Sequence, residues 1–283
     1  MKQKQYILTI AGFDPSSGAG LTSDIKTFEA HGLYGLSVCT AVTVQNDIDF
    51  KDCVWIDKET IINQIETLFE RFEISVVKIG IIQSWSILLE VIQTLKKYNS
   101  SINIVLDPVL KASAGFDFHS EEDMEVFEKV LQHCDFITPN YEEINGLFPN
   151  KSIEETIEFL SERTNIYLKG GHREDKRGWD EVYYYQQLEG NSEIKLKGTN
   201  NGDYNINIRE LKTHLVSKIV QLNIPPKAIT VFEKHGSGCV LSSALASNIA
   251  KQLPIEDACI NAKWYTEQFL NSNKTLLGEH SYK

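Results

Sequence analysis

The sequence predicts an α/β protein in which a mainly parallel sheet is covered by helices. Short apolar runs of β-type alternate with helical stretches from the start of the chain, as in a sheet built from strand-helix-strand units. Polar or turn-forming residues recur where these strands end, which is where open α/β sheets bind ligands. The 283 residues are 42% hydrophobic, enough to bury a core without metals or disulfides. We therefore expect one domain over residues 1–283.

The first two predicted strands cover residues 6–11 and 36–44, and a helix over residues 18–31 joins them. Gly32 is expected to end that helix, because glycine readily adopts the conformation found just after helix C-termini. Asp57 can cap the next helix with its side-chain oxygen. The apolar residues of this second helix recur at the spacing of one buried face: Ile61, Ile62, Ile65, Leu68 and Phe69.

Four later strands are expected, each separated from the next by a helical segment: residues 75–79, 102–106, 136–137 and 166–169. The first three of these strands are followed by Gly80, by Asp107 and by the run at 138–140, so polar or turn residues gather at one edge of the sheet. Residues 120–123 and 152–155 resemble capping boxes, in which a serine precedes an acidic residue by three positions. They predict two further helix starts.

A polar segment from about residue 188 to residue 227 interrupts this alternation. It is rich in asparagine and includes the Asn-Asn-Gly-Asp run at 200–203. Its second half has apolar residues at helical spacing, namely Ile208, Leu211, Leu215, Ile219 and Leu222. We interpret the segment as a surface insertion with its own helix within the single domain.

Charge, cysteine usage and the first residues exclude several classes of protein. There are 28 Lys and Arg against 39 Asp and Glu, and the resulting net charge of -11 opposes binding to a nucleic-acid backbone. The apolar stretch near the start is too short for a signal peptide or a membrane span, so we expect a cytoplasmic protein with no membrane partner. The five cysteines are irregularly spaced without a Cys-x-x-Cys pair, which favours reduced thiols over a zinc site or disulfides.

A glycine-rich loop at residues 12–20 lies between the first strand and the first helix. It lacks the Gly-Lys-Ser/Thr end of a P-loop, and its glycines do not fit Gly-x-Gly-x-x-Gly. One interpretation is a turn whose glycines supply unusual backbone angles. The other is close approach of the backbone to a small ligand, with Asp24 on the following helix directing its carboxylate toward that ligand.

A second motif, at residues 234–240, places Gly236 and Gly238 directly before a helix. The first N–H groups of a helix have no partner within it, and the helix dipole adds positive charge there, so this is an expected anion site. Cys239 lies in the first turn, where the same field should lower the pKa of its thiol below the usual value of about 8.5. The competing interpretation is that Cys239 is a small buried filler.

Carboxylates and amides at other strand ends could bind a metal. Asn140 and Glu143 lie three residues apart on an opening helix turn, and with Asp107 they could hold hydrated Mg²⁺ beside phosphate oxygens. The competing explanation for Asn140 is helix capping. Lys169 would lie near any phosphate bound at the sheet edge, although residues 169–172 also fit a plain turn.

Taken in order, these segments resemble the hydroxymethylpyrimidine and phosphomethylpyrimidine kinases of thiamine biosynthesis, which belong to the ribokinase superfamily. The resemblance covers roughly residues 6–187 and 228–277, leaves the segment around 188–227 unmatched, and implies a ribokinase-like three-layer α/β/α fold. The matching motifs are residues 9–20, 24–28, 35–38, 40–46, 78–80, 106–109, 137–140, 169–172 and 235–239. The C-terminal tail departs from the usual pattern of the family, so we assign no function to His280.

The resemblance also implies roles for individual residues. Asp24 and Gln45 correspond to the residues that contact the pyrimidine. The positions that line the same pocket are Gly12, Thr43, Ile81 and Val109. The anion-binding turn corresponds to Gly236 and Gly238, and Cys239 to the residue that accepts the substrate hydroxyl proton, where other superfamily members carry aspartate. The expected nucleotide-binding residues are Asn140, Lys169, Gly171 and Ser237, and the expected metal ligands are Asp107 and Glu143.

The implied activity is ATP-dependent phosphorylation of 4-amino-5-hydroxymethyl-2-methylpyrimidine and then of its monophosphate, with Mg²⁺ as cofactor and ATP as co-substrate. Pyridoxal or pyridoxine kinase activity is the first alternative, because related enzymes share the cysteine motif. A hydrolase with Cys239 as nucleophile and His235 as base is a second alternative, and a non-catalytic pyrimidine-binding protein is a third. A homodimer is also considered.

Overall fold

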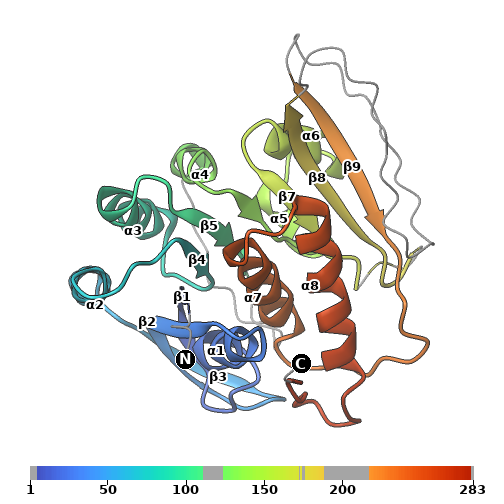
Figure 1. Cartoon of the computed structure of the whole chain (residues 1–283), viewed down its shortest axis with the longest axis horizontal. Coiled ribbons are helices and arrows are strands. Elements are labelled where there is room, and N and C mark those ends of the chain that lie inside the picture. The colour runs from blue at the N-terminus through green and yellow to red at the C-terminus, as the bar shows by residue number, and fades with distance from the viewer. Residues whose placement is uncertain (1–4, 111–123, 172, 174–175, 188–216, 282–283) are drawn as a thin grey trace.

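The computed structural model describes residues 5–110, 124–171, 173, 176–187 and 217–281, and these residues form one nine-stranded sheet with helices on both faces (Figure 1). The sheet order is β3-β2-β1-β4-β5-β6-β7-β8-β9. All pairs from β2 to β7 are parallel, whereas β2 pairs antiparallel with β3, and β8 pairs antiparallel with both β7 and β9. The expected mainly parallel sheet is therefore confirmed.

The strand bounds agree with the sequence prediction over the parallel part of the sheet. The strands are β1 (Tyr6–Phe13), β2 (Tyr34–Gln45), β3 (Phe50–Trp55), β4 (Val76–Ile79), β5 (Asn103–Leu106), β6 (Phe136–Ile137), β7 (Asn165–Leu168), β8 (Asp180–Gln187) and β9 (Ser217–Ile224). The strands β3, β8 and β9 were not predicted. All three belong to the antiparallel margins, where no helix separates consecutive strands to mark them in the sequence.

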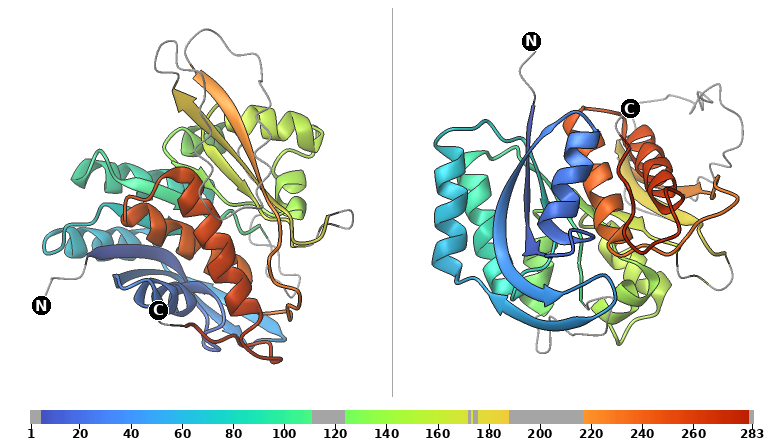
Figure 2. Two further views of the ribbon diagram at one scale, coloured as in Figure 1. Left: turned by 45° about the vertical axis from the view of Figure 1, so that its right-hand side comes forward. Right: turned by 90° about the horizontal axis from the view of Figure 1, so that it is seen from below.

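Helices form two layers, one on each face of the sheet (Figure 2). One layer contains α2 (Lys58–Phe69), α3 (Trp85–Tyr98), α4 (Met124–Leu131), α5 (Tyr141–Leu147) and α6 (Ile153–Ser161). The opposite layer contains α1 (Gly20–Ala30), α7 (Ser237–Ala250) and α8 (Ile255–Leu270). Alternate residues of each central strand face opposite layers. In β1, Ile7 packs with the layer of α1, α7 and α8, and Leu8 packs with the layer of α2 to α6. This is the expected three-layer α/β/α arrangement.

Three residues that the sequence predicts at helix ends occupy those positions in the structure. Asp57 accepts a hydrogen bond from the Thr60 N–H at the start of α2, and Ser152 forms a capping box with Glu155 at the start of α6. Gly32 follows α1 with φ +77°, in the left-handed region. The expected helix start at 120–123 lies outside the described residues.

The prediction for the segment 188–227 was wrong in one part. Ile219 and Leu222 were assigned to a helix, but they lie in strand β9, where both are buried against the sheet. Ile219 packs in one hydrophobic core and Leu222 in the other, so this strand carries apolar residues on both faces, and such residues can match helical spacing over a short run. The other three positions of that pattern, Ile208, Leu211 and Leu215, lie outside the described residues.

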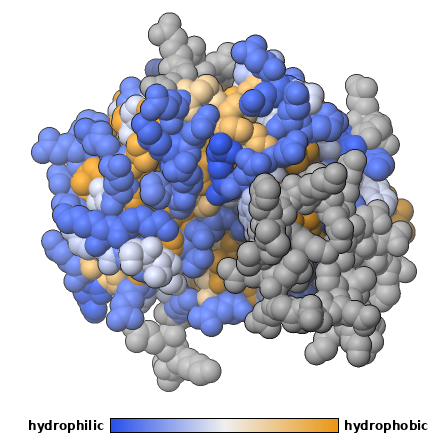
Figure 3. All heavy atoms as spheres, turned by 90° about the horizontal axis from the view of Figure 1, so that it is seen from above, coloured by the Kyte–Doolittle hydropathy of each residue, from blue (hydrophilic) through white to orange (hydrophobic). Residues whose placement is uncertain are grey.

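Among the described residues, no helix combines the length and the apolar character needed to cross a bilayer. The face shown in Figure 3 is largely hydrophilic, with smaller hydrophobic areas between the polar side chains.

Candidate active site

The loop after β1 is organised by the carboxylate of Asp14, which is almost fully buried. One oxygen, Oδ1, accepts the N–H of Ser16 at 2.8 Å, and Oδ2 accepts both the Ser16 hydroxyl and the Ala19 N–H at 2.9 Å. Burial alone would raise the pKa of Asp14, but the bond with His235 and these N–H and hydroxyl bonds outweigh it and lower that pKa. The carboxylate is therefore ionised and holds the glycine-rich loop in one conformation.

The turn before α7 lies directly against this loop. Gly236 has φ +76° and is the N-cap of α7, and a Cβ at this position would collide with the Gly18 carbonyl oxygen. The His235 ring packs on the other side of Gly18, where its Nε2 lies 2.8 Å from Asp14 Oδ2. Gly18 and Gly236 therefore allow the two backbones to approach each other closely, a contact that neither interpretation of the loop proposed.

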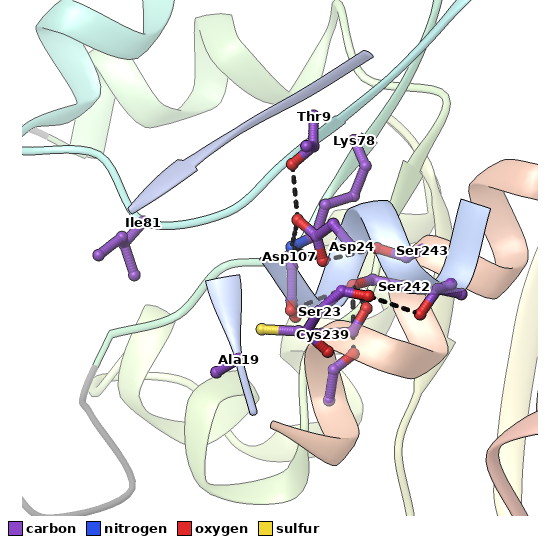
Figure 4. A network of polar contacts seen from close by, with 12 residues as sticks. Thr9, Ala19, Ser23, Asp24, Lys78, Ile81, Asp107, Cys239, Ser242 and Ser243 are labelled. Atoms are coloured by element: carbon purple, nitrogen blue, oxygen red, sulfur yellow. Dashed lines mark hydrogen bonds and ion pairs between the residues drawn. The ribbon is translucent and has the colours of Figure 1, made fainter. Parts of the chain in front are cut away.

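Cys239 lies in the first turn of α7 and is half-buried. Its sulfur points away from the helix toward the side where Ala19 and Ile81 lie (Figure 4). The expected lowering of its pKa is wrong: burial raises the pKa of the Cys239 thiol to about 11, and the charges of Asp107 and Asp24 act in the same direction. Lys78 and the Gly20 N–H oppose this rise without reversing it. The loss of hydration therefore outweighs the helix N-terminus, and the free protein holds a neutral thiol.

The carboxylate of Asp24 is bonded to side chains within the protein, and its contact with the substrate remains a prediction. Its side chain is fully buried and ion-paired with Lys78, whose Nζ lies 2.9 Å from Oδ2 and 3.1 Å from Oδ1. Thr9 Oγ1 donates to Oδ2 at 2.6 Å, and Ser243 Oγ donates to Oδ1 at 2.7 Å (Figure 4). Four donor contacts from Lys78, Thr9 and Ser243 therefore satisfy this carboxylate within the protein, and the sequence analysis identified none of these partners.

Helix α7 is held in place through the face that carries Cys239. Ser242 and Ser243 follow Cys239 by three and four residues and therefore lie on the same side of the helix. Ser242 Oγ donates to Asp107 Oδ2 at 3.2 Å, while Ser243 Oγ donates to Asp24. Two buried carboxylates from other elements thus fix the N-terminal half of α7 over the ends of the central strands.

Lys169 brings the two expected metal ligands together. Its Nζ lies 2.9 Å from Asp107 Oδ1 and 3.3 Å from Glu143 Oε2, and a Cβ on Gly238 would lie 3.3 Å from the same nitrogen. Burial would raise the pKa of Asp107, but the charges of Lys169 and Lys78 outweigh it and lower that pKa. For Glu143 burial dominates over the attraction of Lys169, so its pKa is raised. A cation at the end of β7 therefore sits between two carboxylates and the start of α7.

These residues fit Mg²⁺, which takes one or two carboxylates together with water and phosphate oxygens. Two carboxylates, from Asp107 and Glu143, already converge on one cation. Among the described residues, no group of three or more His, Cys, Asp or Glu side chains is placed to hold a metal ion. The ligand roles themselves remain predictions.

Asn140 caps helix α5, as its competing interpretation proposed. Its Oδ1 accepts the N–H groups of Glu142 and Glu143, and Glu143 Oε2 accepts the Asn140 N–H at 2.7 Å. Asn140 also pairs with Lys169 in a short parallel bridge. The capping box therefore orients the Glu143 carboxylate beside Lys169, and a direct contact of Asn140 with nucleotide remains a prediction.

The residues expected to line the pyrimidine pocket gather at neighbouring strand ends. Gly12 is in close contact with Ile81, since a Cβ on Gly12 would collide with that side chain. Gln45 Nε2 donates to Thr43 Oγ1 at 2.8 Å, and Thr43 in turn donates to the Phe13 carbonyl at 2.9 Å. These contacts join the ends of β1 and β2 with the segment after β4.

The remaining predicted residues lie on segments that neighbour these strand ends in the sequence. Val109 is half-buried just after β5, and Ser237 is the first residue of α7. Gly171 is exposed, and a Cβ there would meet no atom within 4 Å. His172, the last residue of its motif, lies outside the described residues.

Sequence reasoning missed several residues that build the site. Asp14 was part of the glycine-rich motif but received no role, and Ser242 and Ser243 were treated only as small residues of a helix. Lys78 offered a usable signal, because a lysine in the otherwise apolar strand β4 must be paired when the strand is buried on both faces.

Comparison with known proteins gives a consistent result. The profile described as phosphomethylpyrimidine kinase matches residues 14–203 and 196–282. A hydroxymethylpyrimidine/phosphomethylpyrimidine kinase from Aquifex aeolicus is 32% identical over 277 residues, which cover 94% of this chain and 95% of that protein. The crystal structure of phosphomethylpyrimidine kinase from Clostridium difficile 630 has a TM-score of 0.66 and 30% identity, with 93% of this chain and 98% of that chain covered.

Pyridoxal kinase from Staphylococcus aureus, solved in complex with pyridoxal, has a TM-score of 0.72 at 20% identity, with 99% of this chain and 94% of that chain covered. At that identity the likeness concerns the fold, and the ribokinase-like three-layer architecture is thereby confirmed. The profile match and the Aquifex relative both extend over most of the sequence and agree on the kind of enzyme. The chain belongs to the phosphomethylpyrimidine kinase family of phosphotransferases.

Proposed function

We propose that this chain is an ATP-dependent kinase that phosphorylates 4-amino-5-hydroxymethyl-2-methylpyrimidine and its monophosphate in thiamine biosynthesis. The observation that carries the proposal is the meeting of three groups at one edge of the sheet. These are the start of α7 with Cys239, the Lys169 cation with its two carboxylates, and the contacts around Gly12 and Gln45.

The phosphoryl step needs little covalent chemistry from the protein. The substrate hydroxyl oxygen bonds to the γ-phosphorus of ATP while the bond from that phosphorus to the bridging oxygen of the departing ADP breaks. The hydroxyl proton passes to Cys239 in its thiolate form. Since the raised pKa makes this thiolate scarce in the free protein, we expect the rate to rise with pH.

Charge stabilisation comes from the start of α7 and from Lys169. The N–H groups near Gly238 and Cys239 have no partner within the helix, and the dipole of the 14-residue α7 favours negative charge there. If a Cβ were added to Gly238, it would lie 3.3 Å from Lys169 Nζ. This ammonium can therefore reach a phosphate held at the start of α7. Mg²⁺, if held by Asp107 and Glu143, would neutralise phosphate charge.

The pyrimidine end of the site is proposed at Gln45 and Thr43. A primary amide carries both donors and an acceptor, so the Gln45 side chain can match a ring nitrogen and an exocyclic amine. Its bond to Thr43 holds the amide in one orientation. This pairing suits an aminopyrimidine ring, which presents an acceptor nitrogen beside an amine.

Incubation with ATP, Mg²⁺ and each substrate tests the proposal. We expect hydroxymethylpyrimidine to give first the monophosphate and then the pyrophosphate, separated by chromatography and identified by mass. The kcat/KM for hydroxymethylpyrimidine should exceed that for pyridoxal and pyridoxine. Folded protein that transfers no phosphate to either pyrimidine would exclude the proposal, and a preference for pyridoxal would replace it by the vitamin B6 alternative.

Further expectations accompany this proposal. They are the cytoplasmic location, the lack of nucleic-acid and membrane partners, and a homodimer. Tight pyrimidine binding without ATP turnover would instead indicate a non-catalytic binding protein.

A further inference from the structure

The Asp14–His235 pair is the contact from which we draw a further inference. It joins the loop after β1 to the turn before α7 across 221 residues of sequence, and both side chains are nearly buried. Because an ionised carboxylate only accepts hydrogen bonds, the imidazole donates from Nε2. A donor at this one ring position therefore connects the two glycine motifs.

The contact is part of an interlock between two backbones. The His235 ring lies against Gly18, and Gly236 lies against the Gly18 carbonyl oxygen so closely that neither glycine has room for a Cβ. On its other side, the turn is tied to the C-terminal segment, since the His235 N–H donates to the Leu276 carbonyl at 2.9 Å. The turn that starts α7 is thus held from two directions.

The loop holds the carboxylate of Asp14 in place independently of His235. The other hydrogen bonds of this carboxylate all come from the loop at residues 16–19. His235 directly precedes Gly236, which has φ +76°, and the N–H groups that start α7 follow. A shift of about 1 Å in such groups can cost on the order of 100-fold in rate.

We propose that His235 and Asp14 are positioning residues that set the anion-binding turn at the start of α7 relative to the loop after β1. The kinetic test of this inference rests on the proposed kinase function. The test by hydrogen exchange rests on the geometry alone. His235 touches no reacting atom in this scheme; it acts through the turn that contains Gly236 and Gly238.

Two substitutions of His235 separate positioning from packing. In His235→Gln the side-chain amide nitrogen is as many bonds from Cβ as Nε2, and it can donate to Asp14. In His235→Asn the amide nitrogen occupies the place of Nδ1 and cannot donate to Asp14.

We expect His235→Asn to lower kcat by about tenfold to 100-fold with the pyrimidine KM changed less than about threefold, and His235→Gln to keep most of kcat. His133→Asn, at an exposed histidine, is the matched control and should keep wild-type kinetics.

Hydrogen exchange provides a readout that does not depend on turnover. The peptide containing residues 234–240 should exchange faster in His235→Asn than in His235→Gln, while peptides from the central strands stay unchanged. If His235→Asn does not fold, Gly18→Ala takes its place, because the added methyl collides with the His235 ring and displaces it from Asp14.

Equal kcat and equal exchange in the Asn and Gln variants would overturn the inference, whether both are impaired or both are normal. Hydrogen exchange at residues 234–240 that is the same in Gly18→Ala as in the wild type would also overturn the inference. Wild-type protein that phosphorylates neither pyrimidine would remove the proposed function, and the exchange comparison would still decide the role of His235.

Discussion

The ammonium of Lys78 lies 2.9 Å from a carboxylate oxygen of Asp24, and neither side chain has any solvent exposure. Burial would lower the pKa of Lys78, but Asp24 and the neighbouring negative charges outweigh it and raise that pKa, so the lysine is charged. The pair lies below the start of α7, where Ser243 bonds to the same carboxylate. Removal of one partner leaves the other charge buried alone.

We expect Lys78→Met or Asp24→Asn alone to lower the free energy of unfolding by about 3–5 kcal/mol. The double variant should lose much less than the sum, because no uncompensated charge remains and the Thr9 and Ser243 hydroxyls can either donate or accept. Urea unfolding followed by circular dichroism measures this. The exposed pair of Lys58 and Glu90 is the control, and Lys58→Met should change stability by less than about 1 kcal/mol. Additive losses in the double variant would contradict the pairing argument.

The second prediction concerns Cys239 as proton acceptor. Cys239→Ala should fold normally and lower kcat by about 100-fold or more. In the wild type kcat/KM should rise between pH 7 and pH 9, because the thiolate is the active form and burial raises the thiol pKa to about 11. Cys239→Asp should flatten this rise, since a carboxylate is ionised throughout the range.

The matched control is Cys259→Ala, at a buried cysteine of α8 that packs in the hydrophobic core. Its kinetics should equal those of the wild type. A Cys239→Ala variant with near-wild-type turnover would exclude the thiol as the base, and an identical pH profile in Cys239→Asp would do the same.

The third prediction tests Glu143 as a magnesium ligand. Glu143→Gln keeps a side chain that can complete the capping box with Asn140, so α5 should stay intact while one negative charge is lost. We expect the Mg²⁺ concentration for half-maximal rate to rise by about tenfold, because one of two carboxylate ligands becomes a weaker neutral oxygen. Glu142→Gln, one residue away and exposed, should leave the Mg²⁺ dependence unchanged. The same Mg²⁺ curve in both variants would remove Glu143 from the metal site.

The fourth prediction concerns stability at mildly acidic pH. Burial lowers the pKa of both His31 and His280 to about 4, and both rings pack against Tyr265. Between about pH 6.5 and pH 4 the unfolded chain binds protons that the folded protein does not, so the free energy of unfolding falls as pH falls through this window. Above about pH 6.5 neither state gains a proton, and this contribution is constant.

His280→Asn provides the check, because its amide nitrogen takes the place of Nδ1, which lies 2.9 Å from the Tyr265 hydroxyl, and does not titrate. Urea unfolding at pH 7 and pH 5 should show a smaller loss of stability in this variant than in the wild type. An equal loss would show that His280 does not carry the pH dependence.

The central fold could be predicted because its signals are local. The strand that contains Ile79 and the strand that contains Leu106 are short apolar runs bounded by turn residues, and Asp57 and Ser152 cap helices through bonds within four residues. The edge strands gave weaker signals. In β9, Ile219 and Leu222 fit helical spacing, whereas Val220, Leu222 and Ile224 fit the alternation of a strand, and pairing with β8 selected the strand.

By itself, the sequence determined the parallel strands and their succession along the chain, the helix caps and the edge of the sheet at which the polar motifs meet, because parallel strands end at a common edge. Tertiary structure decided the partners. Asp24 pairs with Lys78 across 54 residues, Lys169 with Asp107 across 62, and His235 with Asp14 across 221. It also decided that Cys239 is a neutral thiol, since desolvation depends on what surrounds the sulfur in space and no local pattern records it.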